Sequence, residues 1–103
     1  MSDQNIQVED RGSVVVVSPE GDIDISRSPD FRARLRTVND NKPMKLVVDL
    51  QKVGYMDSSG LATLVECMRT AKGNDTEMIL CGMNDRVREL IEIAPLAQFI
   101  HQQ

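Results

Sequence analysis

Two short, nearly continuous apolar segments with an amphipathic pattern between them constrain this chain more than any other feature. The segments are KLVVDL at 45–50 and EMILCGM at 77–83, and such runs predict strands covered on both faces. The pattern between them predicts a helix over residues 58–72, closed by Gly73. Its apolar face consists of Leu61, Leu64, Val65, Met68 and Ala71. Strand, helix and strand in this order make the two strands parallel, with a right-handed crossover, so the sequence predicts an α/β protein.

The residues before this unit predict a hairpin and then a helix. Strands at Gln7–Glu9 and Val14–Ser18 flank the turn sequence EDRGS. Ser28 is a good N-cap and Pro29 suits the first position of a helix over about residues 29–39. The apolar face of this helix consists of Phe31, Leu35 and Val38.

The residues after the unit predict a third helix. Asn84 or Asp85 caps it, Pro95 ends or kinks it, and LAQFI (96–100) forms a last packed turn or short helix. The inner face of the third helix consists of Val87, Leu90, Ile91 and Ala94. The predicted order is β-β-α-β-α-β-α. It gives a mixed, mostly parallel sheet of four to five strands, with an N-terminal hairpin and helices packed against the sheet.

Length, charge and cysteine content narrow the function. A chain of 103 residues predicts a single domain over residues 1–103. The net charge of −4 and the scattered aromatic residues argue against nucleic-acid binding. No apolar run reaches the ~18–20 residues of a membrane span, and the N-terminus has no export-signal pattern, so we expect a cytoplasmic protein with no membrane partner. Cys67, which falls off the main apolar face of its helix, and Cys81 lack the spacing of a metal site; we expect reduced thiols and neither metal nor cofactor.

Two acidic loops follow predicted strands and precede predicted helices. One contains Asp57-Ser58-Ser59-Gly60, directly before the second helix, and the other contains Gly21-Asp22-Ile23-Asp24. In open α/β sheets, functional groups gather beyond the carboxyl ends of parallel strands. If the strands before the two loops are neighbours, both loops lie at one edge of the sheet.

The residues alone leave several interpretations of Asp57-Ser58-Ser59-Gly60. In the first, Asp57 or a serine caps the helix, which contributes about 1 kcal/mol, and Gly60 permits a tight entry. A nucleophilic serine lacks a base, because the single histidine, His101, is the third residue from the end. An acidic site of Asp22, Asp24 and Asp57 for a cation such as Mg²⁺, or for a phospho-aspartate as in receiver domains, is a further alternative. Receiver domains, however, pair adjacent acids and use a lysine that is missing here.

The last interpretation is a phosphoserine switch. A serine at a helix N-terminus is exposed, and free N–H groups and the helix dipole accommodate a phosphate there. The phosphate adds a charge of about −1.5 to −2 beside Asp24 and Asp57. A partner docked over this surface meets repulsion that costs several kcal/mol.

The segments MDSSGLA and KLVVDLQKVGY, with PEGDIDISRSPDFRARL upstream, resemble the anti-sigma factor antagonists, small bacterial proteins made of one STAS domain. The resemblance covers nearly the whole chain and is most specific in the segment D-S-S/T-G-L. In that family, the serine after the aspartate is phosphorylated by a serine kinase that is itself the anti-sigma factor. The resemblance therefore implies the STAS fold and a regulated member of the family.

Carried over residue by residue, the resemblance implies Ser58 as the phosphate acceptor, with Asp57 beside it. Ser59 takes the place of the neighbouring hydroxyl and is a secondary candidate, and Gly60 takes that of the family glycine. The family segment G-x-[LI]-D matches Gly21-Asp22-Ile23-Asp24, which implies that this acidic loop belongs to the docking and phosphorylation surface.

The resemblance also implies partners. Unmodified members bind the kinase and release its sigma factor, and a PP2C-type phosphatase removes the phosphate. We therefore expect a monomeric transcription regulator that acts by partner switching and has no enzymatic activity.

Ala62 departs from the second glycine of many members, at a position that bears on partner fit. Other STAS proteins lack the serine and serve as structural subunits, so an adaptor in another regulatory or transport complex is the alternative function.

Overall fold

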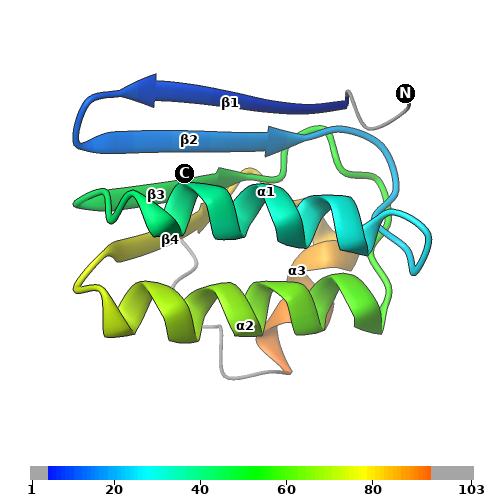
Figure 1. Cartoon of the computed structure of the whole chain (residues 1–103). Helices are drawn as coiled ribbons and strands as arrows, with labels where there is room; N and C mark the ends of the chain where they lie inside the picture. The colour runs from blue at the N-terminus through cyan, green and yellow to red at the C-terminus, as the bar shows by residue number, and fades with distance from the viewer. Residues whose placement is uncertain (1–4, 94–103) are drawn as a thin grey trace.

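The computed structural model of the chain describes residues 5–93, and these form a four-stranded sheet and three helices (Figure 1). The strands are β1 (Ile6–Arg11), β2 (Val14–Pro19), β3 (Lys45–Asp49) and β4 (Glu77–Cys81). The helices are α1 (Ser28–Asp40), α2 (Ser58–Gly73) and α3 (Asp85–Glu92). The predicted order of elements is confirmed. No helix within residues 5–93 is long and apolar enough to cross a membrane.

The sheet is mixed and mostly parallel, as predicted. β1 pairs with β2 in an antiparallel hairpin whose turn contains Gly12 at a φ of 83°, a conformation that glycine adopts without strain. β2, β3 and β4 then run parallel, in the order β1-β2-β3-β4. Because parallel neighbours end at the same edge, the loops that follow β2 and β3 lie together (Figure 1).

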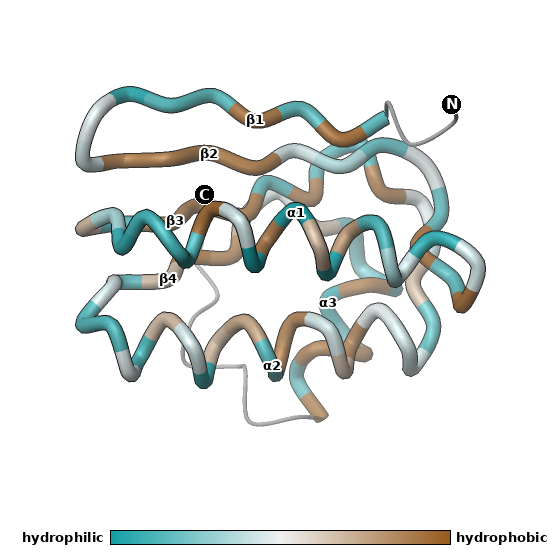
Figure 2. Tube along the Cα trace, in the orientation of Figure 1, coloured by the Kyte–Doolittle hydropathy of each residue, from teal (hydrophilic) through white to brown (hydrophobic). Residues whose placement is uncertain are grey.

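The core lies between the sheet and the helices α1 and α2, which run side by side along it (Figure 1). In β2, Val15 and Val17 are buried whereas Val14 and Val16 are only half-buried, because successive side chains of a strand point to opposite faces. Figure 2 shows β2 as apolar over most of its length and α1 as a helix in which polar and apolar stretches alternate. The largest fully buried side chains include Phe31, Ile23, Leu35, Leu46, Leu50, Leu64, Leu80 and Ile91.

The buried face of α2 differs from the prediction at Cys67. This side chain is 4% exposed, and both Cys67 and Cys81 are free thiols. The small thiol packs like an apolar side chain and faces α1, where Asn39 Nδ2 donates to its sulfur at 3.5 Å. Burial raises the pKa of the Cys67 thiol to about 11. The prediction failed because Leu61 and Val65, counted there as core, are only partly buried and line a surface groove instead.

Helix ends follow the prediction in part. Asn84 caps α3, since its Oδ1 accepts from Val87 N at 2.9 Å. Ser28 is the first residue of α1 and not its N-cap; the N-cap is Arg27, without a capping side chain. The Ser28 hydroxyl lies instead within hydrogen-bond distance, 2.9 Å, of the carbonyl of Asp24, because the preceding turn brings that carbonyl back to the helix start. α3 ends at Glu92, and the predictions for residues 94–100 lie outside the described residues.

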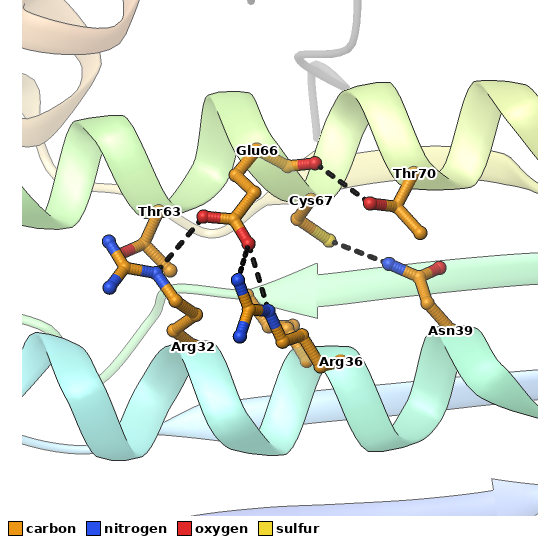
Figure 3. A pocket seen from close by; sticks show the side chains of 8 residues that line it. Arg32, Arg36, Asn39, Thr63, Glu66, Cys67 and Thr70 are labelled. Carbon is orange, nitrogen blue, oxygen red and sulfur yellow. Dashed lines mark hydrogen bonds and ion pairs between the residues drawn. The ribbon is translucent and has the colours of Figure 1, made fainter.

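Polar side chains join α1 to α2 along their length (Figure 3). Glu66 of α2 accepts from Arg36 Nη2 at 2.6 Å and pairs with Arg32 Nε at 3.1 Å. Together with Asn39, Cys67 and their neighbours, these residues enclose a cavity of about 10 Å³, room for about one water molecule. The contacts orient the two helices relative to one another, and with them the loops that lead into each helix.

Candidate functional site

Backbone hydrogen bonds join the two acidic loops. Asp57 N donates to the carbonyl of Ile23 at 3.1 Å, and Ile23 forms an isolated parallel bridge with Met56 beyond the ends of β2 and β3. The prediction that both loops lie at one edge of the sheet is confirmed. We call the surface made by residues 20–28 and 52–60 the rim.

Asp57, a residue of the rim, is the N-cap of α2. Its Oδ1 accepts from Ser59 N at 2.8 Å, from the Ser59 hydroxyl at 2.5 Å and from Gly60 N at 3.3 Å. The Ser59 hydroxyl, followed by weaker backbone N–H contributions, holds the pKa of the Asp57 carboxyl below its usual value. The helix-cap interpretation is therefore correct for Asp57.

Asp24 repeats this arrangement in the loop before α1. Its Oδ1 accepts from Ser26 N at 3.0 Å, from the Ser26 hydroxyl at 2.7 Å and from Arg27 N at 3.2 Å. The Ser26 hydroxyl is the main reason that the pKa of the Asp24 carboxyl is lowered, while the nearby charge of Asp57 raises it. Electrostatics thus couple the two carboxylates, and the backbone N–H of Ile25 in this loop also contributes to the lowered pKa of the Asp57 carboxyl.

A pair of hydroxyls connects the two loops. Ser28 Oγ lies 2.7 Å from Ser59 Oγ, and Ser28 is only 3% exposed. Each hydroxyl has one proton to donate. Because the carboxylate of Asp57 is the strongest acceptor, the Ser59 proton points to it, and Ser28 donates either to Ser59 or to the carbonyl of Asp24. Ser59 is thus held from two sides.

Gly60 permits the close approach of the loops. A Cβ atom at this position would lie 2.6 Å from Met56 Cγ and 3.2 Å from the carbonyl oxygen of Ile23. The second distance matters because a backbone atom cannot move aside as a flexible side chain can. The predicted tight entry at Gly60 thus has a steric cause, contact with the neighbouring loop.

Ser58 differs from the other polar residues of the rim. It is the first residue of α2 and is exposed, and within residues 5–93 its hydroxyl makes no hydrogen bond. Two shallow grooves meet at Ser58: one runs along α2 past Leu61 and Val65, and the other runs toward Arg86 of α3. Asp22 is exposed on the same rim.

The start of α2 has fewer free backbone N–H groups for an anion than the sequence predicted. The prediction relied on free N–H groups at the start of α2, but Asp57 already accepts from those of Ser59 and Gly60. Nor do three or more His, Cys, Asp or Glu side chains gather within residues 5–93 in a way that could hold a metal ion.

Sequence reasoning missed four residues of this surface. Ser28 was assigned only a capping role, and Arg86 was assigned none. Ile25 and Tyr55 received no role, yet they are 77% and 48% exposed on the rim. The available signal for Ile25 and Tyr55 was their position: Ile25 directly follows Asp24, and Tyr55 lies two residues before Asp57.

Comparison with known proteins supports a specific family. The sequence model of the STAS domain family matches residues 5–103. The anti-sigma-B factor antagonist of Staphylococcus aureus is 29% identical over 97 residues, which cover 94% of this chain and 90% of that protein. The anti-sigma-B factor antagonist of Listeria monocytogenes is 32% identical over 80 residues, which cover 78% of this chain and 70% of that protein.

Solved structures share the fold. An anti-sigma factor antagonist from Mycobacterium paratuberculosis matches with a TM-score of 0.86 at 24% identity, over 100% of this chain and 90% of that one. The Bacillus cell fate determinant SpoIIAA, in its phosphorylated form, matches with a TM-score of 0.78 at 20% identity, over 95% and 90%. The chain belongs to the STAS domain family and, within it, to the anti-sigma factor antagonists.

Proposed function

We propose that this protein is a partner-switching regulator whose state is set by phosphorylation of Ser58. The unmodified chain binds an anti-sigma factor that is also a serine kinase, and so releases the sigma factor. The kinase then transfers a phosphate to Ser58 and the complex dissociates. A PP2C-type phosphatase restores the unmodified form. This cycle needs no catalytic residue in the chain.

The observation that carries the proposal is the contrast between Ser58 and Ser59. The Ser59 hydroxyl is bound by Asp57 at 2.5 Å and by Ser28 at 2.7 Å. Phosphorylating it would remove the proton that Ser59 donates to Asp57 and would place a negatively charged group against that carboxylate and the buried Ser28. The Ser58 hydroxyl is exposed, so a phosphate there leaves the cap and the fold intact. Ser58 is therefore the acceptor that a kinase can modify without unfolding its substrate.

The rim also supplies what a partner needs. Ile25 and Tyr55 expose apolar surface on either side of the acidic residues, and isolated apolar side chains of this kind supply binding energy when a partner covers them. Asp22, Asp24 and Asp57 already make this surface negative. A further charge of about −1.5 to −2 on Ser58 would leave an unpaired anion in the interface, which costs several kcal/mol. Since about 1.4 kcal/mol is tenfold in affinity, one phosphate suffices to dissociate the complex.

The test uses the serine kinase encoded beside the gene for this chain, with ATP, and maps the modified residue by mass spectrometry. We expect phosphate on Ser58 in the wild-type chain and in Ser59→Ala, the matched control, and none in Ser58→Ala. Ser58→Ala should bind the kinase and resist release by ATP. Ser58→Asp should be folded and bind at least a hundredfold more weakly. Phosphate on Ser59 alone, or unchanged affinity of Ser58→Asp, would refute the proposal.

A further inference from the structure

We propose that Arg86 binds the phosphate of phosphorylated Ser58 across the groove between the start of α2 and α3. This inference rests on the proposed function and describes how the modified state is held. It assigns a specific cation of this chain to the phosphate. The two cations of the rim itself are already engaged: Lys52 pairs with Glu20 at 3.4 Å, and Arg27 donates to the carbonyls of Glu20 and Asp22.

The groove brings the two side chains together. Its walls are the segment from Tyr55 to Ser58 on one side and Arg86, with Val87 and Leu90, on the other; it has a volume of about 490 Å³. Arg86 is exposed and lies in the first turn of α3. A phosphate on Ser58 thus enters a groove whose opposite wall carries a guanidinium group.

The position of Arg86 relative to the rim is fixed. Val87 and Ile91, on the inner face of α3, are 1% and 0% exposed. Asn84, which caps α3, also donates from Nδ2 to the carbonyl of Gly54 at 3.2 Å. The start of α3 is therefore anchored both in the core and to the loop that carries Ser58, which keeps Arg86 beside the groove that Ser58 also lines.

Charge explains why the phosphate turns toward Arg86. The N–H groups of Ser59 and Gly60 are used by Asp57, whose negative charge also repels a phosphate. Within the described residues, Arg86 has no ion-pair partner, whereas Arg88 of the same helix pairs with Glu92 at 3.2 Å. An arginine binds phosphate through parallel N–H groups. The pairing orients the phosphate toward α3 and offsets only part of its charge of about −1.5 to −2, so the rim still becomes more negative.

The experiment places phosphoserine at position 58 by genetic code expansion and follows its ionisation by ³¹P NMR. Without a neighbouring cation, the phosphoserine pKa is expected to be about 6. A cation that favours the dianion lowers this pKa. We expect Arg86→Ala to raise the phosphoserine pKa by about 0.5, the size of an exposed ion pair, and Arg86→Lys to raise it less. The difference should diminish at high salt because screening weakens such pairs.

Arg69→Ala is the matched control. Arg69 lines the other groove that meets at Ser58, but it lies eleven residues further along α2, about 16 Å along the axis. An equal phosphoserine pKa in Arg86→Ala and the parent protein, or an equal rise in Arg69→Ala, would overturn the inference. Because phosphoserine is installed without a kinase, this result is independent of whether the kinase modifies Ser58. Failure of the switch and failure of the Arg86 contact are therefore distinguishable.

Discussion

The two loops of the rim have the same local geometry and display different side chains. In Asp24-Ile25-Ser26-Arg27, the aspartate Oδ1 accepts from the hydroxyl and N–H two residues on and from the N–H three residues on. In Asp57-Ser58-Ser59-Gly60, the same three kinds of donor bind Asp57 Oδ1. In both loops the turn leaves the residue after the aspartate exposed.

The exposed residue is where the loops diverge. The first turn presents Ile25, which is 77% exposed, and the second presents Ser58. The same hydrogen-bonded frame therefore displays an apolar side chain for binding in one loop and a modifiable hydroxyl in the other. The side chain at this second position, with the hydrogen-bonded frame kept, separates a residue proposed for binding from a residue proposed for switching.

The largest expected effect tests whether Ile25, the exposed residue of the first loop, contacts the kinase. Ile25→Ala removes apolar area that we expect the kinase to cover, and burial of such a side chain is worth about 1.5–3 kcal/mol. The affinity of the unmodified chain for the kinase should fall about ten- to a hundredfold, as measured by isothermal titration calorimetry. Met44→Ala is the control: Met44 is 72% exposed but precedes β3, at the opposite end of that strand from the rim. Equal losses in the two variants would mean that Ile25 has no special contact.

The next largest effect concerns the fourth residue of each loop, which is Arg27 in the first loop and Gly60 in the second. Gly60→Ala places a Cβ against Met56 Cγ and the carbonyl of Ile23, and overpacking of this kind costs about 1–3 kcal/mol. The free energy of unfolding, measured by urea denaturation, should fall by that amount. Gly73→Ala is the control, because a Cβ there meets no atom within 4 Å among the described residues and alanine favours a helix. A stable Gly60→Ala would show that the loops can separate without loss.

Much of the fold was predictable because its signals are local. The two buried strands and the helix between them follow from hydrophobic periodicity, and the parallel pairing follows from their order. The common edge of the loops depended on β2 lying next to β3, which sequence order alone does not fix; the structure supplies that pairing. The candidate residues Asp24 and Asp57 were found, since acids directly before helices are conspicuous.

The sequence predictions failed for residues whose role depends on a partner distant in the sequence. The pairing of Ser28 with Ser59 joins positions 31 residues apart, and no local pattern signals it. Cys67 was misplaced because the apolar stripe of α2 contains both core and surface-groove residues, and periodicity does not distinguish them. Arg86 was missed for the same reason, since only the packing of α3 brings it near Ser58.

A smaller effect tests the contact that links the loops. Ser28→Ala removes a buried hydroxyl from Ser59 and from the carbonyl of Asp24. That carbonyl keeps its backbone donors Arg27 N and Ser28 N, so no acceptor is left unpaired, and the free energy of unfolding should fall by only about 1 kcal/mol. Ser26→Ala, which removes an exposed hydroxyl from Asp24 alone, should cost less. If both variants unfold at the same urea concentration, the bond between the loops adds nothing to stability.

The smallest effect distinguishes the two carboxylates by their pKa values. Because the serine hydroxyl is the largest cause of each lowered pKa, Ser59→Ala should raise the pKa of Asp57, and Ser26→Ala should raise that of Asp24. Carbon-detected NMR titration of the side-chain carboxyls measures both. Each variant should leave the pKa of the other loop's aspartate nearly unchanged, and a joint rise in both variants would mean that the loops form one electrostatic unit.

The same lowered pKa values determine how stability depends on pH. A carboxyl that is more acidic in the folded state than in the unfolded state contributes stability above its unfolded pKa, about 3.9, and this contribution is lost as the pH falls below that value. Asp57→Asn keeps an oxygen that can cap α2 but removes the charge. Its free energy of unfolding should therefore fall less steeply than that of the wild type below about pH 4, and the two proteins should differ most at neutral pH. Because both carboxylates are reached by solvent, the effect is small; parallel pH profiles would show that the hydroxyl of Ser59 stabilises the turn without favouring the charge.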